Sequence, residues 1–279
     1  MRVRTICFPN LFTVFAILCA VSIPAVAQDD SGLRRLTTRS DVFGWEAVGR
    51  VDIGSTGFCT GVLLRPDIVL TAGHCLFSPE TGERNDPTSI VFRSGLRDGK
   101  SVVERKVARG VVHPEYQYQG NDGLQQIRYD IALLQLASPI PAATAAPYLI
   151  QSFSGLGDEV AVVSYALGRE NALSQQRRCG VLGRRDGLIA FSCDVTFGSS
   201  GAPVFDMSGD RGRIVSIISS GGQYDGERVS FGMELPVLVN DLYTAFRTGK
   251  GVLPVEPITA RRLQAGSGTR SGGAKFVRP

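Results

Sequence analysis

A turn rich in serine and glycine carries the first side chains that could do chemistry, in TFGSSGAPVF at residues 196–205. A serine hydroxyl attacks a carbonyl when a nearby base takes its proton and backbone N–H groups stabilise the oxyanion. Glycine allows the dihedrals that turn neighbouring amides the same way. We interpret Ser200 as a candidate nucleophile, with the N–H groups of Gly198 and Ser200 as a candidate oxyanion hole. The alternative is an ordinary surface turn.

Only two histidines could supply the base, His74 in TAGHC and His113 in VHP. His74 follows a strand-like run, whereas Pro114 ends the run before it and favours a structural role for His113. Asp130 opens DIALLQL, so its carboxylate leads directly into an apolar strand and needs a partner where it is buried. It either caps a turn or holds an imidazole in one tautomer.

The first 27 residues have the features of a secretory signal. Two arginines precede an apolar run from Leu11 to Ile23, and small residues end at Ala27. The run is short for a membrane anchor, so we expect cleavage before Gln28 and no stable membrane association afterwards. The prediction is therefore a secreted or periplasmic protein.

Removing the signal changes the cysteine count and the charge. Of six cysteines, two lie in the signal, and an even number in an exported chain indicates disulfides; the four that remain are Cys59, Cys75, Cys179 and Cys193. The formal charge of +4 falls to +2 when Arg2 and Arg4 leave, which gives no reason to expect nucleic-acid binding. Two distant histidines and paired cysteines leave no metal-ligand cluster, and we expect no cofactor.

Many short strand-like runs separated by turn residues predict an all-β domain, a barrel or a sandwich. The expected strands are 47–53, 58–64, 67–72, 89–93, 106–112, 131–136, 159–165, 187–191, 202–205, 214–219 and 229–233. One helix is predicted near the end by apolar residues at helical spacing, namely Leu235, Leu238, Val239, Leu242, Tyr243 and Phe246. Residues 28–44 are expected to be a lead-in or short pro-segment, and residues 251–279 a basic, disordered tail.

TAGHC, YDIALLQL and GSSGAP, in this order, resemble the trypsin-like serine proteases of the chymotrypsin fold, bacterial secreted branch. The resemblance covers residues 45–250 and implies two packed six-stranded antiparallel β-barrels with a C-terminal helix. It implies that His74 is the general base, that Asp130 orients it and that Ser200 forms the acyl-enzyme. It also implies a Cys59–Cys75 disulfide, which leaves Cys179 and Cys193 as the second pair.

Two residues, Ser199 and Ala202, depart from the family pattern. Ser199 stands where the digestive enzymes have an aspartate, and no Ile-Val-Gly-Gly start is present, which argues against activation by a new N-terminus. Ala202 replaces a glycine and is tolerated if its φ is negative. Asp194 matches the acid that selects Arg or Lys in trypsin; alternatively it makes a structural hydrogen bond. Family members that cut after Glu use an extra histidine, and both histidines here are otherwise placed.

The leading function is thus a secreted, monomeric serine endopeptidase acting on a protein or peptide substrate. An esterase of the α/β-hydrolase class is disfavoured because Ala202 breaks its Gly-x-Ser-x-Gly motif and because its order is Ser, Asp, His. The remaining alternative is a catalytically silent binding protein with a protease fold. Such proteins usually lose a triad member, and this sequence retains all three.

Overall fold

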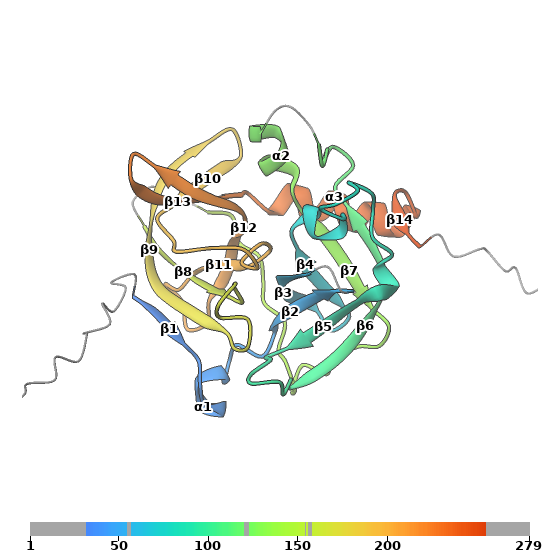
Figure 1. Cartoon of the computed structure of the whole chain (residues 1–279), viewed down its shortest axis with the longest axis horizontal. Coiled ribbons are helices and arrows are strands. Elements are labelled where there is room, and N and C mark those ends of the chain that lie inside the picture. Colours follow the sequence, from blue (N-terminus) through green and yellow to red (C-terminus); the bar gives the residue numbers. More distant parts are fainter. Residues whose placement is uncertain (1–31, 55–56, 120–122, 154, 156–157, 255–279) are drawn as a thin grey trace, which may run out of the picture. The chain divides into compact units, whose positions relative to one another are not determined.

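The computed structural model describes residues 32–54, 57–119, 123–153, 155 and 158–254. The predicted signal and most of the predicted tail lie outside the described residues. Two sheets make up the fold, and each closes on itself because the strand at one end also pairs with the strand next to the other end. Figure 1 shows them side by side, one in blue to green and the other in yellow to orange.

The first barrel contains six antiparallel strands and closes through pairing of β6 with β7. Its strands are β2 (Val48–Ile53), β3 (Gly57–Arg65), β4 (Ile68–Thr71), β5 (Ile90–Ser94), β6 (Val103–Val112) and β7 (Ala132–Leu136). Runs of Val, Leu and Ile explain the closure, because β-branched and aliphatic side chains pack well inside a small barrel. The two-residue strand β14 (Val252–Leu253) adds to β6.

The second barrel also has six antiparallel strands and closes between β8 and β9. Its strands are β8 (Glu159–Ser164), β9 (Ser174–Arg185), β10 (Leu188–Phe191), β11 (Pro203–Asp206), β12 (Arg213–Tyr224) and β13 (Glu227–Met233). The predicted pair of six-stranded barrels is confirmed. The short strand β1 (Leu33–Arg35) pairs with β9, so part of the expected lead-in joins this sheet.

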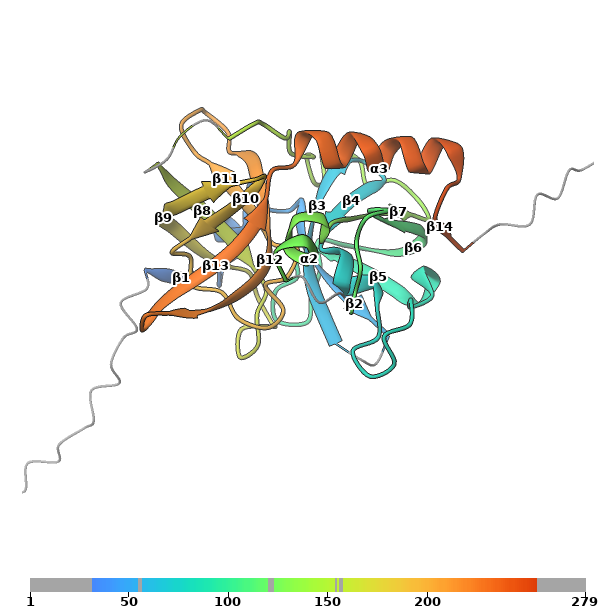
Figure 2. The same cartoon turned by 90° about the horizontal axis from the view of Figure 1, so that it is seen from above.

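The helix predicted near the end is α3 (Pro236–Thr248), which begins with a proline in its first turn and ends at Gly249 with φ of 72°. It buries Val239, Leu242 and Ala245. Although it follows the second barrel in sequence, it packs on β6 and β7 of the first, as Figure 2 shows. The helix thereby ties the two barrels together.

Short helical segments complete the described chain. They are α1 (Arg39–Val42), α2 (Gly123–Tyr129) and the 3₁₀ turns η1 (Gly73–Leu76) and η2 (Pro87–Ser89). Two of them matter for function, because η1 carries His74 and α2 ends just before Asp130. No helix among the described residues has both the length and the apolar character that crossing a membrane requires.

Candidate active site

His74 and Asp130 come together because neighbouring strands deliver them to the same edge of the first barrel. Strands β4 and β7 are paired, with Thr71 opposite Ala132, so the residues just beyond these positions face each other. One carboxylate oxygen of Asp130 lies 2.7 Å from Nδ1 of His74. The other accepts the backbone N–H of His74, also at 2.7 Å. Asp130 therefore fixes both the ring and the main chain of His74.

The carboxylate of Asp130 is buried, and its side chain is only 4% exposed. A third donor, the hydroxyl of Ser219 on β12, reaches the same oxygen that faces the ring, at 2.6 Å. Three hydrogen bonds offset the cost of burying the charge. Burial by itself would lower the pKa of His74, but the charge of Asp130 and the hydrogen bond to it raise that pKa above 6.5. Ser219 was not singled out in the sequence.

The serine turn lies against the part of the first barrel that leads to His74. The backbone N–H of Thr60 donates to the carbonyl of Ser200 at 2.9 Å. Gly201 packs so closely that an added Cβ would lie 2.3 Å from the carbonyl oxygen of Thr60 and 2.7 Å from the nitrogen of Ala72. Gly201 also has a φ of 77°, so the close approach and the backbone both require glycine.

The two predicted oxyanion donors are available. Within the described part of the chain, neither the N–H of Gly198 nor that of Ser200 is engaged by another protein group. Gly198 has a φ of 90°, and a Cβ there would lie 2.3 Å from the ring of Phe58. The turn thus leaves two backbone donors beside a partly exposed serine, which is the arrangement that a developing oxyanion needs.

The two residues that depart from the family pattern have structural roles in the same turn. Ser199 is fully buried, and its hydroxyl lies 3.4 Å from that of Ser164. Its backbone N–H donates to the carbonyl of Thr196 at 2.9 Å, which closes the turn. Ala202 is buried and is not among the residues with positive φ, so the methyl group in place of a glycine hydrogen is accommodated.

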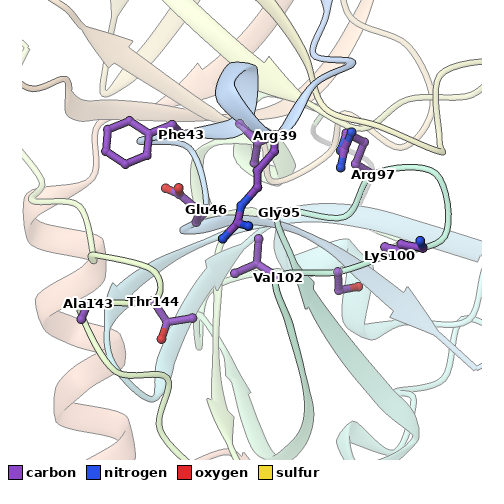
Figure 3. A pocket seen from close by; sticks show the side chains of 11 residues that line it. Arg39, Phe43, Glu46, Gly95, Arg97, Lys100, Val102, Ala143 and Thr144 are labelled. Atoms are coloured by element: carbon purple, nitrogen blue, oxygen red, sulfur yellow. The ribbon is translucent and has the colours of Figure 1, made fainter.

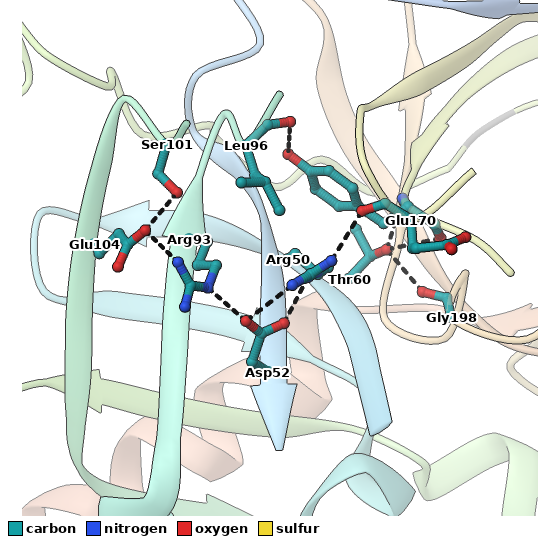
Figure 4. Close-up of polar contacts among 10 residues, drawn as sticks. Arg50, Asp52, Thr60, Arg93, Leu96, Ser101, Glu104, Glu170 and Gly198 are labelled. Atoms are coloured by element: carbon teal, nitrogen blue, oxygen red, sulfur yellow. Dashed lines mark hydrogen bonds and ion pairs between the residues drawn. The ribbon is translucent and has the colours of Figure 1, made fainter. Parts of the chain in front are cut away.

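Thr60 connects the two barrels at this point, as Figure 4 shows. Its hydroxyl donates to the carbonyl of Gly198 at 2.8 Å and accepts the N–H of Tyr165 at 3.0 Å. Nearby, Arg50 bonds to Asp52 and also donates to the carbonyl of Glu170 at 3.0 Å. Strands of the first barrel therefore hold both the serine turn and the loop between β8 and β9.

Asp194 is buried, with 8% exposure, and already has partners. Its carboxylate forms an ion pair with Arg228 of β13, and its backbone N–H donates to the amide oxygen of Gln176 at 2.7 Å. The sequence left two roles open for Asp194, a substrate contact or a structural bond, and the carboxylate is paired within the protein. Arg228 carried no signal in the sequence, because nothing local marks an arginine that reaches a residue so far away in the chain.

Both expected disulfides are present. Cys59 pairs with Cys75 and Cys179 with Cys193, across 16 and 14 residues respectively. The first links β3 to η1 beside His74. Cys59, His74 and Cys75 are also the one group of described residues compact enough to hold a metal ion, but both sulfurs are in the disulfide. A disulfide sulfur is not a thiolate and does not serve as a zinc ligand.

A hollow of about 630 Å³ lies elsewhere, between α1 and the loop that joins β5 to β6, and Figure 3 shows its basic side chains. Its lining residues are Arg39, Val42, Phe43, Glu46, Gly95, Arg97, Lys100, Ser101, Val102, Ala143 and Thr144. None of the predicted site residues belongs to this set. The hollow is therefore separate in composition from the site around His74.

Comparison with known proteins gives the same family. The model of the trypsin-like peptidase domain matches residues 59–216, more than half of the chain. A glutamyl endopeptidase of Bacillus licheniformis is 25% identical over 233 residues, covering 81% of this chain and 70% of that protein. Trypsin 5G1 of Aedes aegypti is 36% identical over 88 residues, which is 32% of this chain and 29% of the trypsin.

Solved structures agree with the fold. A Glu endopeptidase in complex with MPD superposes with a TM-score of 0.64 at 18% identity, covering 78% of this chain and 97% of that one. The thermostable serine protease AL20 gives a TM-score of 0.58 at 20% identity, covering 73% and 97%. The chain therefore belongs to the trypsin-like peptidase family and is a serine protease.

Proposed function

We propose that the protein is an exported endopeptidase that cleaves peptide bonds through an acyl-enzyme on Ser200. His74 takes the hydroxyl proton through Nε2 and then gives it to the leaving amine. Asp130 keeps the imidazole in the tautomer with its proton on Nδ1 and stabilises the imidazolium. The observation that carries this proposal is that the Asp130 carboxylate is hydrogen-bonded to both the ring and the backbone N–H of His74.

The oxyanion of the tetrahedral intermediate is bound by the N–H groups of Gly198 and Ser200. Their lack of protein acceptors among the described residues supports this role. The bonds from Thr60 to the carbonyls of Gly198 and Ser200 hold the turn before the substrate arrives. Pre-oriented donors stabilise the transition state without reorganisation at the moment of reaction.

Export through the signal at residues 1–27 is part of the proposal. Two disulfides support it, because such bonds persist in oxidising compartments and are rare in the cytosol. The expected mature N-terminus is Gln28, and mass spectrometry of protein exported by a bacterial host tests this. Protein that stays in the cytosol, or that keeps the first 27 residues, would contradict it. For the mature protein we keep the expectation of a monomer acting on protein or peptide substrates.

Two classes of substrate side chain, basic and acidic, are candidates for the residue before the scissile bond. Asp194 predicts Arg or Lys, and its ion pair with Arg228 argues against that class because the carboxylate is already neutralised. An acidic side chain is the second candidate. The relative of Bacillus licheniformis supports it, since that protein is by name a glutamyl endopeptidase.

Labelling with a fluorophosphonate tests the reaction, because this probe reacts only with an activated serine. We expect rapid labelling of the mature protein and none of Ser200→Ala, with kcat lower on the order of 10⁶-fold. Ser208→Ala is the matched control, since Ser208 is exposed and lies on a loop after β11. A catalytically silent binding protein would leave the native chain unlabelled. Labelling that survives in Ser200→Ala would exclude Ser200 as the nucleophile.

A further inference from the structure

Two arginines lie close to the buried carboxylate of Asp194. Arg228 forms an ion pair with Asp194, and a second arginine, Arg169, lies close enough to interact with the charges of both. One carboxylate cannot neutralise two guanidinium groups. The two guanidinium groups therefore share the carboxylate of a buried aspartate that stands six residues before Ser200.

Arg169 has an unused hydrogen-bond donor. Its Nη1 is buried and has no partner among the described residues. Burial lowers the pKa of Arg169; the charge of Asp194 opposes this effect and that of Arg228 adds to it. A buried guanidinium N–H without an acceptor is costly, and a carboxylate is its best partner because the planar fork matches two oxygens. The free protein thus lacks one anion at this point.

The loop that carries Arg169 is fixed against the serine turn. The N–H of Leu167 donates to the carbonyl of Phe197 at 2.7 Å, directly before Gly198. At the other end of the loop, Arg50 holds the carbonyl of Glu170, and the hydroxyl of Thr60 joins Tyr165 to Gly198, as Figure 4 shows. Arg169 therefore lies on a loop that is hydrogen-bonded both to the first barrel and to the serine turn.

Arg228 reaches Asp194 from a different element, strand β13. This strand pairs with β12 from Ile218 to Tyr224. In this ladder Gly221 packs on Val195, one residue after Asp194, and a Cβ at Gly221 would lie 2.6 Å from the Val195 side chain. Strand β12 also supplies Ser219, which bonds to Asp130. The arginine pair, the serine turn and the triad carboxylate are thus linked through neighbouring residues.

We propose that Arg169 and Arg228 together bind the side-chain carboxylate of a glutamate or aspartate at the residue before the scissile bond. This inference rests on the proposed function and names its substrate class. Asp194 is then a positioning residue that holds Arg228. It does not bind an Arg or Lys side chain of the substrate, which is the role that its sequence position suggested. Guanidinium groups take the place of the extra histidine that the family resemblance implies for acidic specificity.

The test compares peptide substrates that differ only in Glu, Gln or Lys before the cleaved bond. We expect the native enzyme to have a higher kcat/KM for Glu than for Gln, by roughly 10- to 100-fold, and lower activity with Lys. In Arg169→Gln the value for Glu should fall at least about tenfold further than the value for Gln. Arg178→Gln is the control, since this side chain is 80% exposed and both values should stay unchanged.

Two kinetic results would overturn the inference. One is a native preference for Lys over Glu, and the other is an unchanged Glu-to-Gln ratio in Arg169→Gln. Binding to Ser200→Ala separates this failure from failure of the proposed function, because calorimetry with product peptides ending in Glu or Gln needs no turnover. Tighter binding of the Glu peptide that is lost in Ser200→Ala/Arg169→Gln supports the inference, and equal binding of the two peptides refutes it. Fluorophosphonate labelling without a Glu preference would leave the serine chemistry intact.

Discussion

His74 faces Asp130 and His113 faces Asp241, and the two pairs differ in distance, in exposure of the carboxylate and in the direction in which the pKa of the ring is shifted. The first pair is joined at 2.7 Å with an Asp side chain that is 4% exposed. The second pair is 3.7 Å apart, beyond hydrogen-bond distance, with an Asp side chain that is 51% exposed. The same two residue types therefore meet in one buried contact and one loose contact.

As a consequence, the pKa values of the two imidazoles are shifted in opposite directions. Both rings are partly or fully buried, which by itself lowers a histidine pKa. At His74 the buried, hydrogen-bonded Asp130 outweighs this effect and raises the pKa. At His113 burial prevails over Asp241, and the pKa falls below 6.5. A carboxylate thus controls an imidazole only when it is itself shielded from water and fixed by further donors.

The largest effect is expected from removing the charge of the close carboxylate. Asp130→Asn should lower kcat by roughly 10⁴-fold, because the amide favours the wrong tautomer of His74. Asp241→Asn is the matched control at the other histidine and should change kcat by less than about twofold. Steady-state kinetics on one peptide substrate measures both. Equal losses in the two variants would show that the comparison does not separate catalysis from structure.

Removing each disulfide tests whether the His74–Asp130 pair depends on the covalent link beside it. Cys59→Ser/Cys75→Ser and Cys179→Ser/Cys193→Ser should each lower the free energy of unfolding by about 3 kcal/mol, because the loops are similar in length. Only the first double variant should also move the pKa of His74, since Cys75 is its neighbour. Urea unfolding and NMR titration provide the two readings. A His74 pKa that shifts only when the second disulfide is removed would contradict this view.

Ser219 sharpens the comparison, because its hydroxyl bonds to Asp130 and no such bond is present at Asp241 among the described residues. Ser219→Ala removes one hydrogen bond to a buried charge, worth about 1.5–3 kcal/mol. We expect kcat/KM to fall roughly 10- to 100-fold for every substrate alike. Ser220→Ala, one residue further along β12, is the control. A change confined to substrates with one type of side chain would instead assign Ser219 to specificity.

NMR titration of the two histidines measures their pKa shifts directly, and the expected effect is smaller than the losses of activity above. Histidine resonances of Ser200→Ala should show one midpoint above pH 6.5 and one below it. The acid limb of kcat/KM should follow the higher midpoint, because the base must be neutral. The resonance that disappears in His113→Gln is thereby assigned to His113. Two midpoints on the same side of 6.5 would refute the assignment of opposite environments.

The smallest effect concerns stability. A raised pKa means that His74 stabilises the fold below pH 6.5 and that this contribution is lost as the pH rises through its folded value. The lowered pKa of His113 gives the opposite sign, with stability present above pH 6.5 and lost as the pH falls. Urea unfolding at pH 5 and pH 8 should show His74→Gln costing more at pH 5 and His113→Gln costing more at pH 8. The same sign for both would contradict the prediction.

The two barrels differ in how well the sequence predicted their strands. All six strands of the first barrel matched apolar runs. In the second, β9 was missed because SQQRRCGVLGRR reads as polar, although Gln175 and Gln176 are 5% and 6% exposed. Asp-Gly pairs before β10 and β13 were the available signals. Asp186 and Asp225 have φ values of 52° and 51°, each followed by a glycine of positive φ, which is typical of tight hairpins.

The sequence by itself determined the elements that have a local cause. Apolar runs predicted the strands of the first barrel, helical spacing predicted α3, and the glycines around Ser200 predicted a turn with free amides. Motif order then indicated which histidine, aspartate and serine to consider together. Each of these signals lies within about a dozen residues of chain, so no folded structure was needed to detect it.

Only the tertiary structure decided what surrounds those residues. Ser219 contacts Asp130 across 89 residues of chain, and Arg228 forms an ion pair with Asp194, for which the sequence left a substrate contact and a structural hydrogen bond as alternatives. Arg169 approaches the same aspartate from a third segment. Charges at close range set pKa values and specificity, and barrel closure rather than sequence neighbourhood decides which charges become close.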